Sequence, residues 1–148
     1  MGPDPEIRFD PCWTQEAALV VNRLHPFSSR SKVSLEELRD HYLISYNLKG
    51  PIGPELVKLV EGHDLSIDYL YADEITLTSI VAGNPDIMAI ACRSWLLDSY
   101  CNEVNLVQIA EAPKAFRQLY ICSKTNIVRP LVVDTFIDLA VAYCAGEL

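Results

Sequence analysis

Hydrophobic residues recur along the chain in short segments that have the spacing of strands. Residues 16–22 carry the continuous apolar run Leu19, Val20 and Val21, which predicts a buried strand. Residues 67–71 alternate apolar and polar positions, as expected for a strand with one covered face. The same reasoning predicts four more strands, at residues 42–46, 87–91, 106–109 and 116–122.

Helix start signals stand between these strands. Ser34 and Glu37 form a capping box, and Pro54 suits the first position of a helix because its missing N–H has no partner there. Asp73 is placed to cap a helix that ends near residue 83, and Pro130 is expected to open a last helix that reaches residue 143. A short helix is also expected at residues 94–100. Strands alternating with helices over short links predict an α/β fold with a mainly parallel sheet.

Ligands of such sheets bind outside the carboxyl ends of the strands, beside the helix N-termini that follow. This rule selects three places in the middle of the chain. The first is the turn after Tyr46, where Asn47, Leu48 and Gly50 offer amides or a side chain to a small anion. The alternative for this segment is an ordinary turn between a strand and a helix.

The second place is the predicted helix start that contains Glu74 and Thr76, because free amides at a helix N-terminus suit a carboxylate. The alternative is simple capping by Asp73, and the two acids at this position disfavour an anion. The third place is Ala91 and Cys92, which end the most apolar strand. Their alternative is packing in the core.

Composition narrows the class of protein. The chain has 148 residues and a formal net charge of -8, so its surface repels phosphate backbones and we expect no nucleic-acid contact by this chain alone. Its five cysteines form no C-x-x-C pair, which is typical of reduced thiols in the cytoplasm. The first residues lack the apolar segment of a signal peptide. The apolar run at 131–144 contains Asp134 and Asp138 and is too short and too charged to span a membrane.

No motif points to catalysis, a metal or a cofactor. The sequence contains no G-x-S-x-G and no P-loop, and its three histidines have no ligand spacing, so we expect neither an enzyme nor a zinc protein. Cys92 and Cys101 flank the short helix at 94–100 and raise the question of a redox switch. Arg93 is the one basic residue near them in sequence, so structural thiols are the preferred interpretation.

The order of these motifs resembles the effector-binding domain of LysR-type transcriptional regulators. The family's strand, His-Pro motif and short Leu-x-x-Leu helix are similar to residues 19–38, and its Val-Ala-x-Gly-x-Gly-Ile run is similar to residues 81–87. Its Arg-x-Leu-Tyr-Leu strand and closing Phe-x-Asp helix are similar to residues 117–121 and 136–138. The resemblance covers residues 16–143 and includes no helix-turn-helix.

The resemblance implies an α/β fold of the periplasmic-binding-protein type II kind, with one complete lobe and part of the other. It places residues 1–33 and 115–148 in a partial lobe one and residues 34–114 in lobe two, with the connector at 25–32 as one of two crossings. The ligand cleft of the family lies between the lobes, and two crossings make the hinge.

The resemblance also implies a function. We expect a small-molecule effector, for which a carboxylate is one candidate class, and a homodimer that transmits effector binding to transcription. The effector-binding candidates are the residues selected above: Asn47, Leu48, Gly50, Glu74, Thr76, Ala91 and Cys92. The alternatives are a solute-binding module of a transport system and a regulator fragment without independent function.

Overall fold

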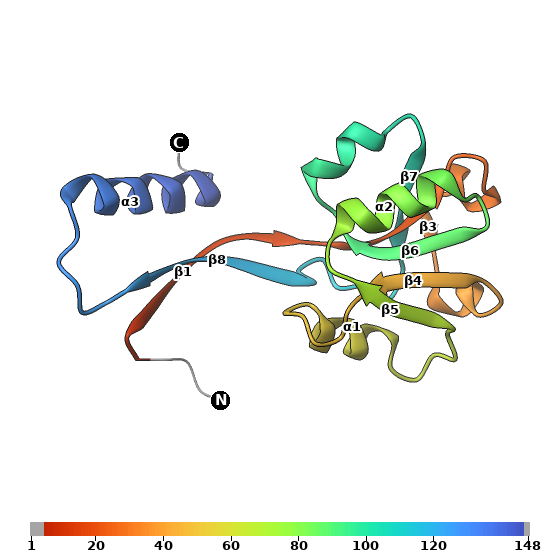
Figure 1. Cartoon of the computed structure of the whole chain (residues 1–148), viewed down its shortest axis with the longest axis horizontal. Helices are drawn as coiled ribbons and strands as arrows, with labels where there is room; N and C mark the ends of the chain where they lie inside the picture. Colours follow the sequence, from red (N-terminus) through yellow and green to blue (C-terminus); the bar gives the residue numbers. More distant parts are fainter. Residues whose placement is uncertain (1–4, 147–148) are drawn as a thin grey trace. The chain divides into compact units, whose positions relative to one another are not determined.

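The computed structural model describes residues 5–146, and the chain forms two compact units (Figure 1). The larger unit comprises Gln15–Arg117. The smaller unit contains the described residues before and after that range.

A six-stranded sheet forms the centre of the larger unit, in the order β3-β7-β2-β6-β4-β5. β2 (Ala17–Asn22) is antiparallel to its neighbours β6 (Ile87–Cys92) and β7 (Val104–Ile109). The other pairings are parallel, so the predicted mainly parallel sheet is confirmed. The remaining strands are β3 (Lys32–Val33), β4 (Tyr42–Tyr46) and β5 (Ile67–Tyr71).

The core lies on both faces of this sheet. Every residue of β2 is buried, and β6 is buried from Met88 to Cys92, which explains why both strands read as continuous apolar runs. Asn22 is the polar exception at the end of β2. Its side-chain amide donates to the carbonyls of Val81 and Ala82 at 3.0 and 2.9 Å, and its oxygen accepts from the Leu24 amide at 2.9 Å.

The helices of the larger unit follow the predicted start signals. Asp73 caps α2 (Glu74–Gly83) by accepting from the Thr76 amide at 2.8 Å. Glu37 accepts from the Ser34 amide at 2.9 Å, and hydrogen bonds from Arg30 and Ser34 lower the pKa of Glu37 to about 2. Helix α1 spans Gly53–Val60, and 3-10 helices occur at Pro26–Ser29 (η1), Leu35–Leu38 (η2) and Trp95–Tyr100 (η3).

The division of the structure differs from the predicted lobe boundaries at residues 33/34 and 114/115. β2 carries two full ladders of hydrogen bonds to β6 and β7, and β3 pairs with β7, so residues 17–33 belong to the larger unit. The connector at 25–32 therefore links two strands of one sheet. His25 is buried there beside Phe27 and His41. The assignment of the two units to the lobes of the family fold stays a prediction.

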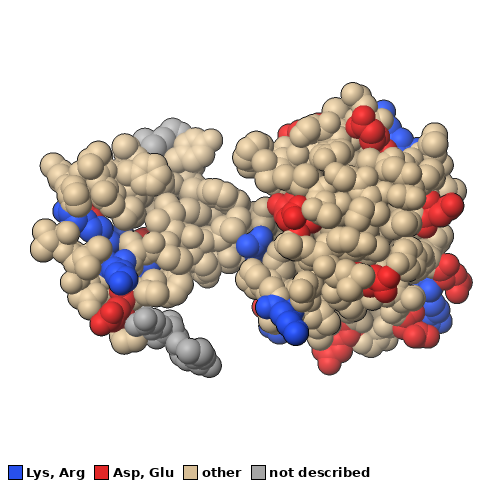
Figure 2. Space-filling view, viewed as in Figure 1, with Lys and Arg blue, Asp and Glu red and all other residues tan. Residues whose placement is uncertain are grey.

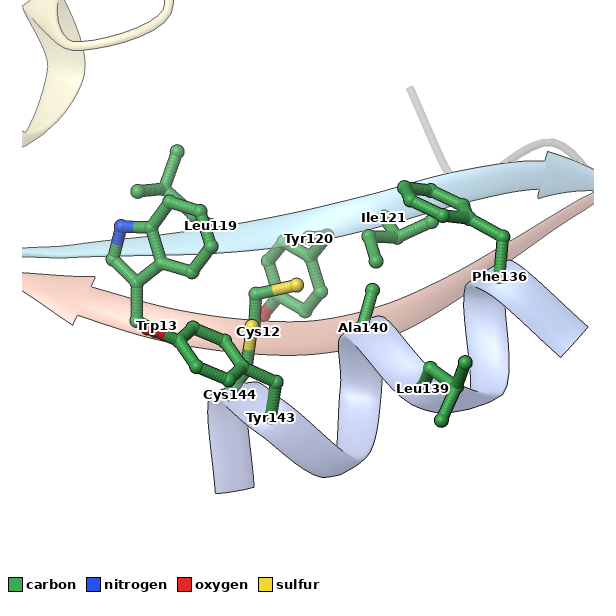
Figure 3. A pocket seen from close by; sticks show the side chains of 10 residues that line it. All are labelled: Cys12, Trp13, Leu119, Tyr120, Ile121, Phe136, Leu139, Ala140, Tyr143 and Cys144. Atoms are coloured by element: carbon green, nitrogen blue, oxygen red, sulfur yellow. The ribbon is translucent and has the colours of Figure 1, made fainter. Parts of the chain in front are cut away.

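The smaller unit consists of a two-stranded sheet, β1 (Ile7–Gln15) with β8 (Arg117–Lys124), and helix α3 (Leu131–Ala145). The chain directions of the two strands are opposite (Figure 3). The helix was predicted to open at Pro130, which is the N-cap residue directly before α3. The side predicted to be its apolar face, which includes Phe136 and Tyr143, is exposed. Ile137 is the buried residue of α3 among the described positions. Figure 2 shows that much of the visible surface of this unit is uncharged.

β1 was not predicted from the sequence. Its apolar positions are interrupted by Asp10 and Pro11, and proline lacks the N–H that a strand donates to its neighbour. The strand forms nevertheless, because the β8 edge is its partner. This pairing joins segments that lie at opposite ends of the sequence.

Candidate functional site

A cavity of about 240 Å³ opens at the carboxyl ends of β4 and β5, within the larger unit. It combines aromatic, amide and charged side chains with the backbone of the turn that follows β4. Its position agrees with the rule that ligands of parallel sheets bind where strands end. The lining residues are Tyr46, Asn47, Gly50, Pro51, Ile52, Tyr71, Ala72, Glu74 and Arg117.

The turn from Asn47 to Gly53 forms one wall, and its own hydrogen bonds fix its shape. The Asn47 amide donates to the carbonyl of Tyr71 at 2.7 Å, which ties the turn to the end of β5. The Asn47 side-chain oxygen accepts from the Lys49 amide at 2.9 Å, and the Gly50 amide donates to the Asn47 carbonyl at 3.0 Å. The amides of Asn47 and Gly50 are thus already paired, and the side-chain NH₂ of Asn47 is the donor that remains for a ligand.

Behind the wall, Tyr46 and Cys92 connect the ends of β4 and β6. The Cys92 amide donates to the Tyr46 hydroxyl oxygen at 2.9 Å, and both residues are buried. Burial raises the pKa of Tyr46 well above its usual range and also raises the pKa of the Cys92 thiol. Both groups are therefore neutral at physiological pH, and Tyr46 can act on a ligand only as a hydrogen-bonding phenol.

Arg117 contributes the positive charge of the cavity. It begins β8, and a guanidinium nitrogen donates a long hydrogen bond of 3.4 Å to the side-chain oxygen of Gln15. The guanidinium also interacts with the Cys92 thiol and opposes the rise of its pKa. Among the described residues Arg117 forms no ion pair, whereas Arg8, Arg30, Arg39 and Arg129 each pair with a carboxylate. Its charge is available to an anionic ligand.

Glu74 brings a negative charge to the same cavity from the first residue of α2. Its negative charge raises the pKa of both Tyr46 and Cys92, as a secondary cause after burial. A cavity that holds one guanidinium and one carboxylate favours a ligand with an anionic group and a separate hydrogen-bond donor. The arrangement provides recognition chemistry, with no nucleophile activated by a base.

Three of the predicted site residues, Asn47, Gly50 and Glu74, line this cavity. Leu48 lies in the same turn but is not part of the lining, and Thr76 donates both its amide and its hydroxyl to Asp73. The geometry at Thr76 thus favours the capping alternative. Ala91 and Cys92 are buried in β6, and Cys92 reaches the cavity only through its contacts with Tyr46 and Arg117. The binding role of all seven residues stays a prediction.

Three residues of the cavity were not predicted from the sequence: Tyr46, Tyr71 and Arg117. The first two are the last residues of β4 and β5, so the rule about carboxyl ends was sufficient to find them. Arg117 had no such signal. It lies at the start of its strand, far from the turn in sequence, and only the folded unit brings it to the cavity.

A larger cavity of about 600 Å³ lies in the smaller unit, between the β1–β8 sheet and α3 (Figure 3). Its lining is almost entirely apolar and aromatic, so it offers few groups to orient a polar metabolite. Within residues 5–146 no group of His, Cys, Asp and Glu is placed to hold a metal ion. No helix in that range has the length and hydrophobicity needed to cross a membrane.

The family model of the LysR substrate binding domain matches residues 2–145. The chain belongs to this family. The LysR substrate-binding domain has a periplasmic-binding-protein type II-like α/β fold, so the predicted fold class and family are confirmed. Effector sensing in transcription regulation is the function of such domains, which confirms the predicted function at this level. Among curated proteins, none matches the chain.

Solved structures of LysR-type regulators share the fold of this LysR substrate-binding domain. The effector-binding domain of QuiR in complex with shikimate is 22% identical, with a TM-score of 0.80 over 100% of this chain and 70% of that one. The regulatory domain of CcmR from Synechocystis PCC6803, in complex with 2-PG, is 17% identical, with a TM-score of 0.76 over 97% and 70%. HinK from Pseudomonas aeruginosa is 17% identical, with a TM-score of 0.71 over 100% and 50%.

Proposed function

We propose that this LysR substrate-binding domain senses a small organic anion through the cavity at the ends of β4 and β5. The effector presents a carboxylate or a similar group to Arg117 and a hydroxyl or ammonium group to Glu74. Asn47 contributes the side-chain NH₂ that its turn leaves unpaired, and Tyr46 and Tyr71 supply aromatic surface with phenolic hydroxyls. The complexes of QuiR with shikimate and of CcmR with 2-PG support a small-molecule ligand.

The unpaired guanidinium of Arg117 is the observation that carries this proposal. An arginine costs less to hold in a cavity when a counter-ion accompanies it, and in the described residues Arg117 has only an amide oxygen and a thiol as partners. A bound carboxylate provides the two acceptor oxygens that match the guanidinium fork. Arg117 thereby determines the class of effector, while the wall residues determine which member of the class fits.

Effector binding acts on transcription by shifting the chain between conformations of different affinity for its partners. We propose that the chain works as a homodimer in the cytoplasm and carries out no catalysis. The net charge of -8 supports the absence of direct DNA contact by these residues. The lack of an activated nucleophile at the cavity supports a binding role.

A thermal-shift screen of small carboxylates, hydroxycarboxylates and amino acids tests this proposal. One chemical class is expected to raise the melting temperature of the wild-type chain. Arg117→Gln removes a charged hydrogen-bonding partner, which is worth about 1.5–3 kcal/mol, so the affinity for that class falls about 10- to 100-fold. Isothermal titration calorimetry with the best compound measures the change.

Arg93→Gln is the matched control, since Arg93 is exposed and lies outside the lining of the cavity. This variant is expected to bind as the wild type does. Glu74→Gln tests the second half of the pocket. It is expected to lower the affinity for a ligand that donates a hydrogen bond to Glu74 and to raise the affinity for a purely anionic ligand. Full binding by Arg117→Gln would place the effector elsewhere and refute the proposed site.

A further inference from the structure

Two cysteines from opposite ends of the chain meet in the apolar cavity of the smaller unit. Cys12 lies on β1, and Cys144 lies in the last turn of α3. Both line the same cavity, where their side chains are half-buried (Figure 3). The pairing is independent of the proposed effector site, which belongs to the larger unit.

The two thiols interact directly. Burial raises the pKa of the Cys144 thiol, and a hydrogen bond with the Cys12 thiol raises it further. In the structure no disulfide joins any of the five cysteines, which are Cys12, Cys92, Cys101, Cys122 and Cys144. Among these five, the pair that lines the same cavity is Cys12 with Cys144.

We propose that Cys12 and Cys144 form an intramolecular disulfide when the protein meets a peroxide. The disulfide joins β1 to α3 and closes a loop that contains almost the whole described chain. It is a reversible modification site, so thiol reductants of the cytoplasm restore the pair.

The reaction balances with one peroxide and no other reactant. The Cys12 thiolate attacks one oxygen of hydrogen peroxide, an S–O bond forms, the O–O bond breaks and water leaves after protonation. The Cys144 sulfur then attacks the Cys12 sulfenic acid, the S–S bond forms, the S–O bond breaks and a second water carries away the Cys144 proton. Two thiols lose two electrons in total, and the peroxide is reduced to two waters.

Burial raises the pKa of the Cys144 thiol, so less of it is thiolate at neutral pH than in an ordinary exposed cysteine, and we assign Cys144 to the second step. The reaction is therefore slow at pH 7 and accelerates as the pH approaches the range where thiols ionise.

The disulfide strengthens a part of the fold that buries few apolar side chains. An isolated two-stranded sheet is marginally stable, and α3 buries only Ile137 among its described residues. A covalent link between β1 and α3 keeps the helix on the sheet and restricts the unfolded chain. Oxidation is expected to raise the melting temperature by about 5 °C or more.

The full chain, fully reduced and then treated with hydrogen peroxide, provides the test. After free thiols are blocked with iodoacetamide, digestion without reductant and mass spectrometry are expected to find the Cys12 and Cys144 peptides linked. The same treatment in urea is expected to give mixed pairs among all five cysteines. Cys144→Ser abolishes both the linked peptide and the rise in melting temperature, whereas Cys101→Ser, at an exposed thiol, retains both.

Three outcomes overturn the inference. One is recovery of Cys12 and Cys144 as separately alkylated peptides from oxidised native protein. Another is a predominant link that involves Cys92, Cys101 or Cys122. The third is a covalent dimer on a non-reducing gel as the main product. Mapping of the wild-type chain decides among them even where a cysteine variant fails to fold.

Discussion

Replacement of Asn22 by leucine is expected to destabilise the larger unit strongly, although the two side chains have similar size. Asn22 is 5% exposed at the end of β2, and it connects this central strand to the C-terminal end of α2. Its side chain donates to the carbonyls of Val81 and Ala82 and accepts from the Leu24 amide. A leucine fills the space and satisfies none of the three groups.

The loss of unfolding free energy in Asn22→Leu depends on which of these three groups find a new hydrogen-bond partner. The Val81 carbonyl still accepts from the Asn84 amide at 3.1 Å, and the neighbouring Leu24 side chain is exposed, so water reaches that amide at small cost. The partly buried Ala82 carbonyl loses its protein partner. An unsatisfied buried group costs about 1–3 kcal/mol, and with the other two weakened hydrogen bonds the total is about 2–3 kcal/mol.

Urea unfolding monitored by circular dichroism measures this change, and the melting temperature is expected to fall by about 6–10 °C. Asn22→Asp keeps the acceptor for the Leu24 amide but places a carboxylate beside two carbonyls. The loss of unfolding free energy in this variant is therefore expected to be larger at pH 8, where the carboxylate is charged, than at pH 5. Asn126→Leu is the matched control, because Asn126 is exposed and belongs to the smaller unit. If Asn22→Leu costs no more unfolding free energy than Asn126→Leu, the polar contact between β2 and α2 does not stabilise the fold.

Two further predictions concern other buried positions. His25 accepts from the Phe27 amide through Nδ1 at 3.1 Å, and burial lowers its pKa in the folded chain. Its protonation therefore favours the unfolded state, so stability is fully present above the unfolded pKa of about 6.5 and falls as the pH drops below it. The wild-type chain is expected to lose unfolding free energy between pH 7.5 and 5.5, and His25→Asn is expected to lose less. An equal loss in both proteins would show that His25 does not cause this pH dependence. Gly53→Ala is expected to cost more than about 2 kcal/mol, because its new Cβ overlaps the backbone of Leu48. Gly83→Ala meets nothing within 4 Å and serves as control in the same melting assay, where equal losses would refute the steric argument.

Local sequence patterns were sufficient to predict most elements of the larger unit. β4, β5 and β6 start where apolar periodicity begins, and α2 begins at the capping residue Asp73. These features depend on neighbours in sequence, namely the alternation of side chains along a strand and a carboxylate that reaches an amide three residues later. The sheet rule then selected the correct edge for a cavity, and with it Asn47, Gly50 and Glu74.

Tertiary structure decided what depends on contacts across the sequence. β1 forms because it pairs with β8, although the sequence of β1 has no clear strand pattern. β2 belongs to the sheet of the larger unit because it pairs with both β6 and β7. Arg117 reaches a cavity whose other residues lie much earlier in the sequence, and Cys12 meets Cys144 from the opposite end of the chain, only in the folded structure. Periodicity shows which face of a helix or strand is apolar. Which element packs against that face depends on the free energy of the whole packed unit, and a local sequence pattern does not determine this free energy.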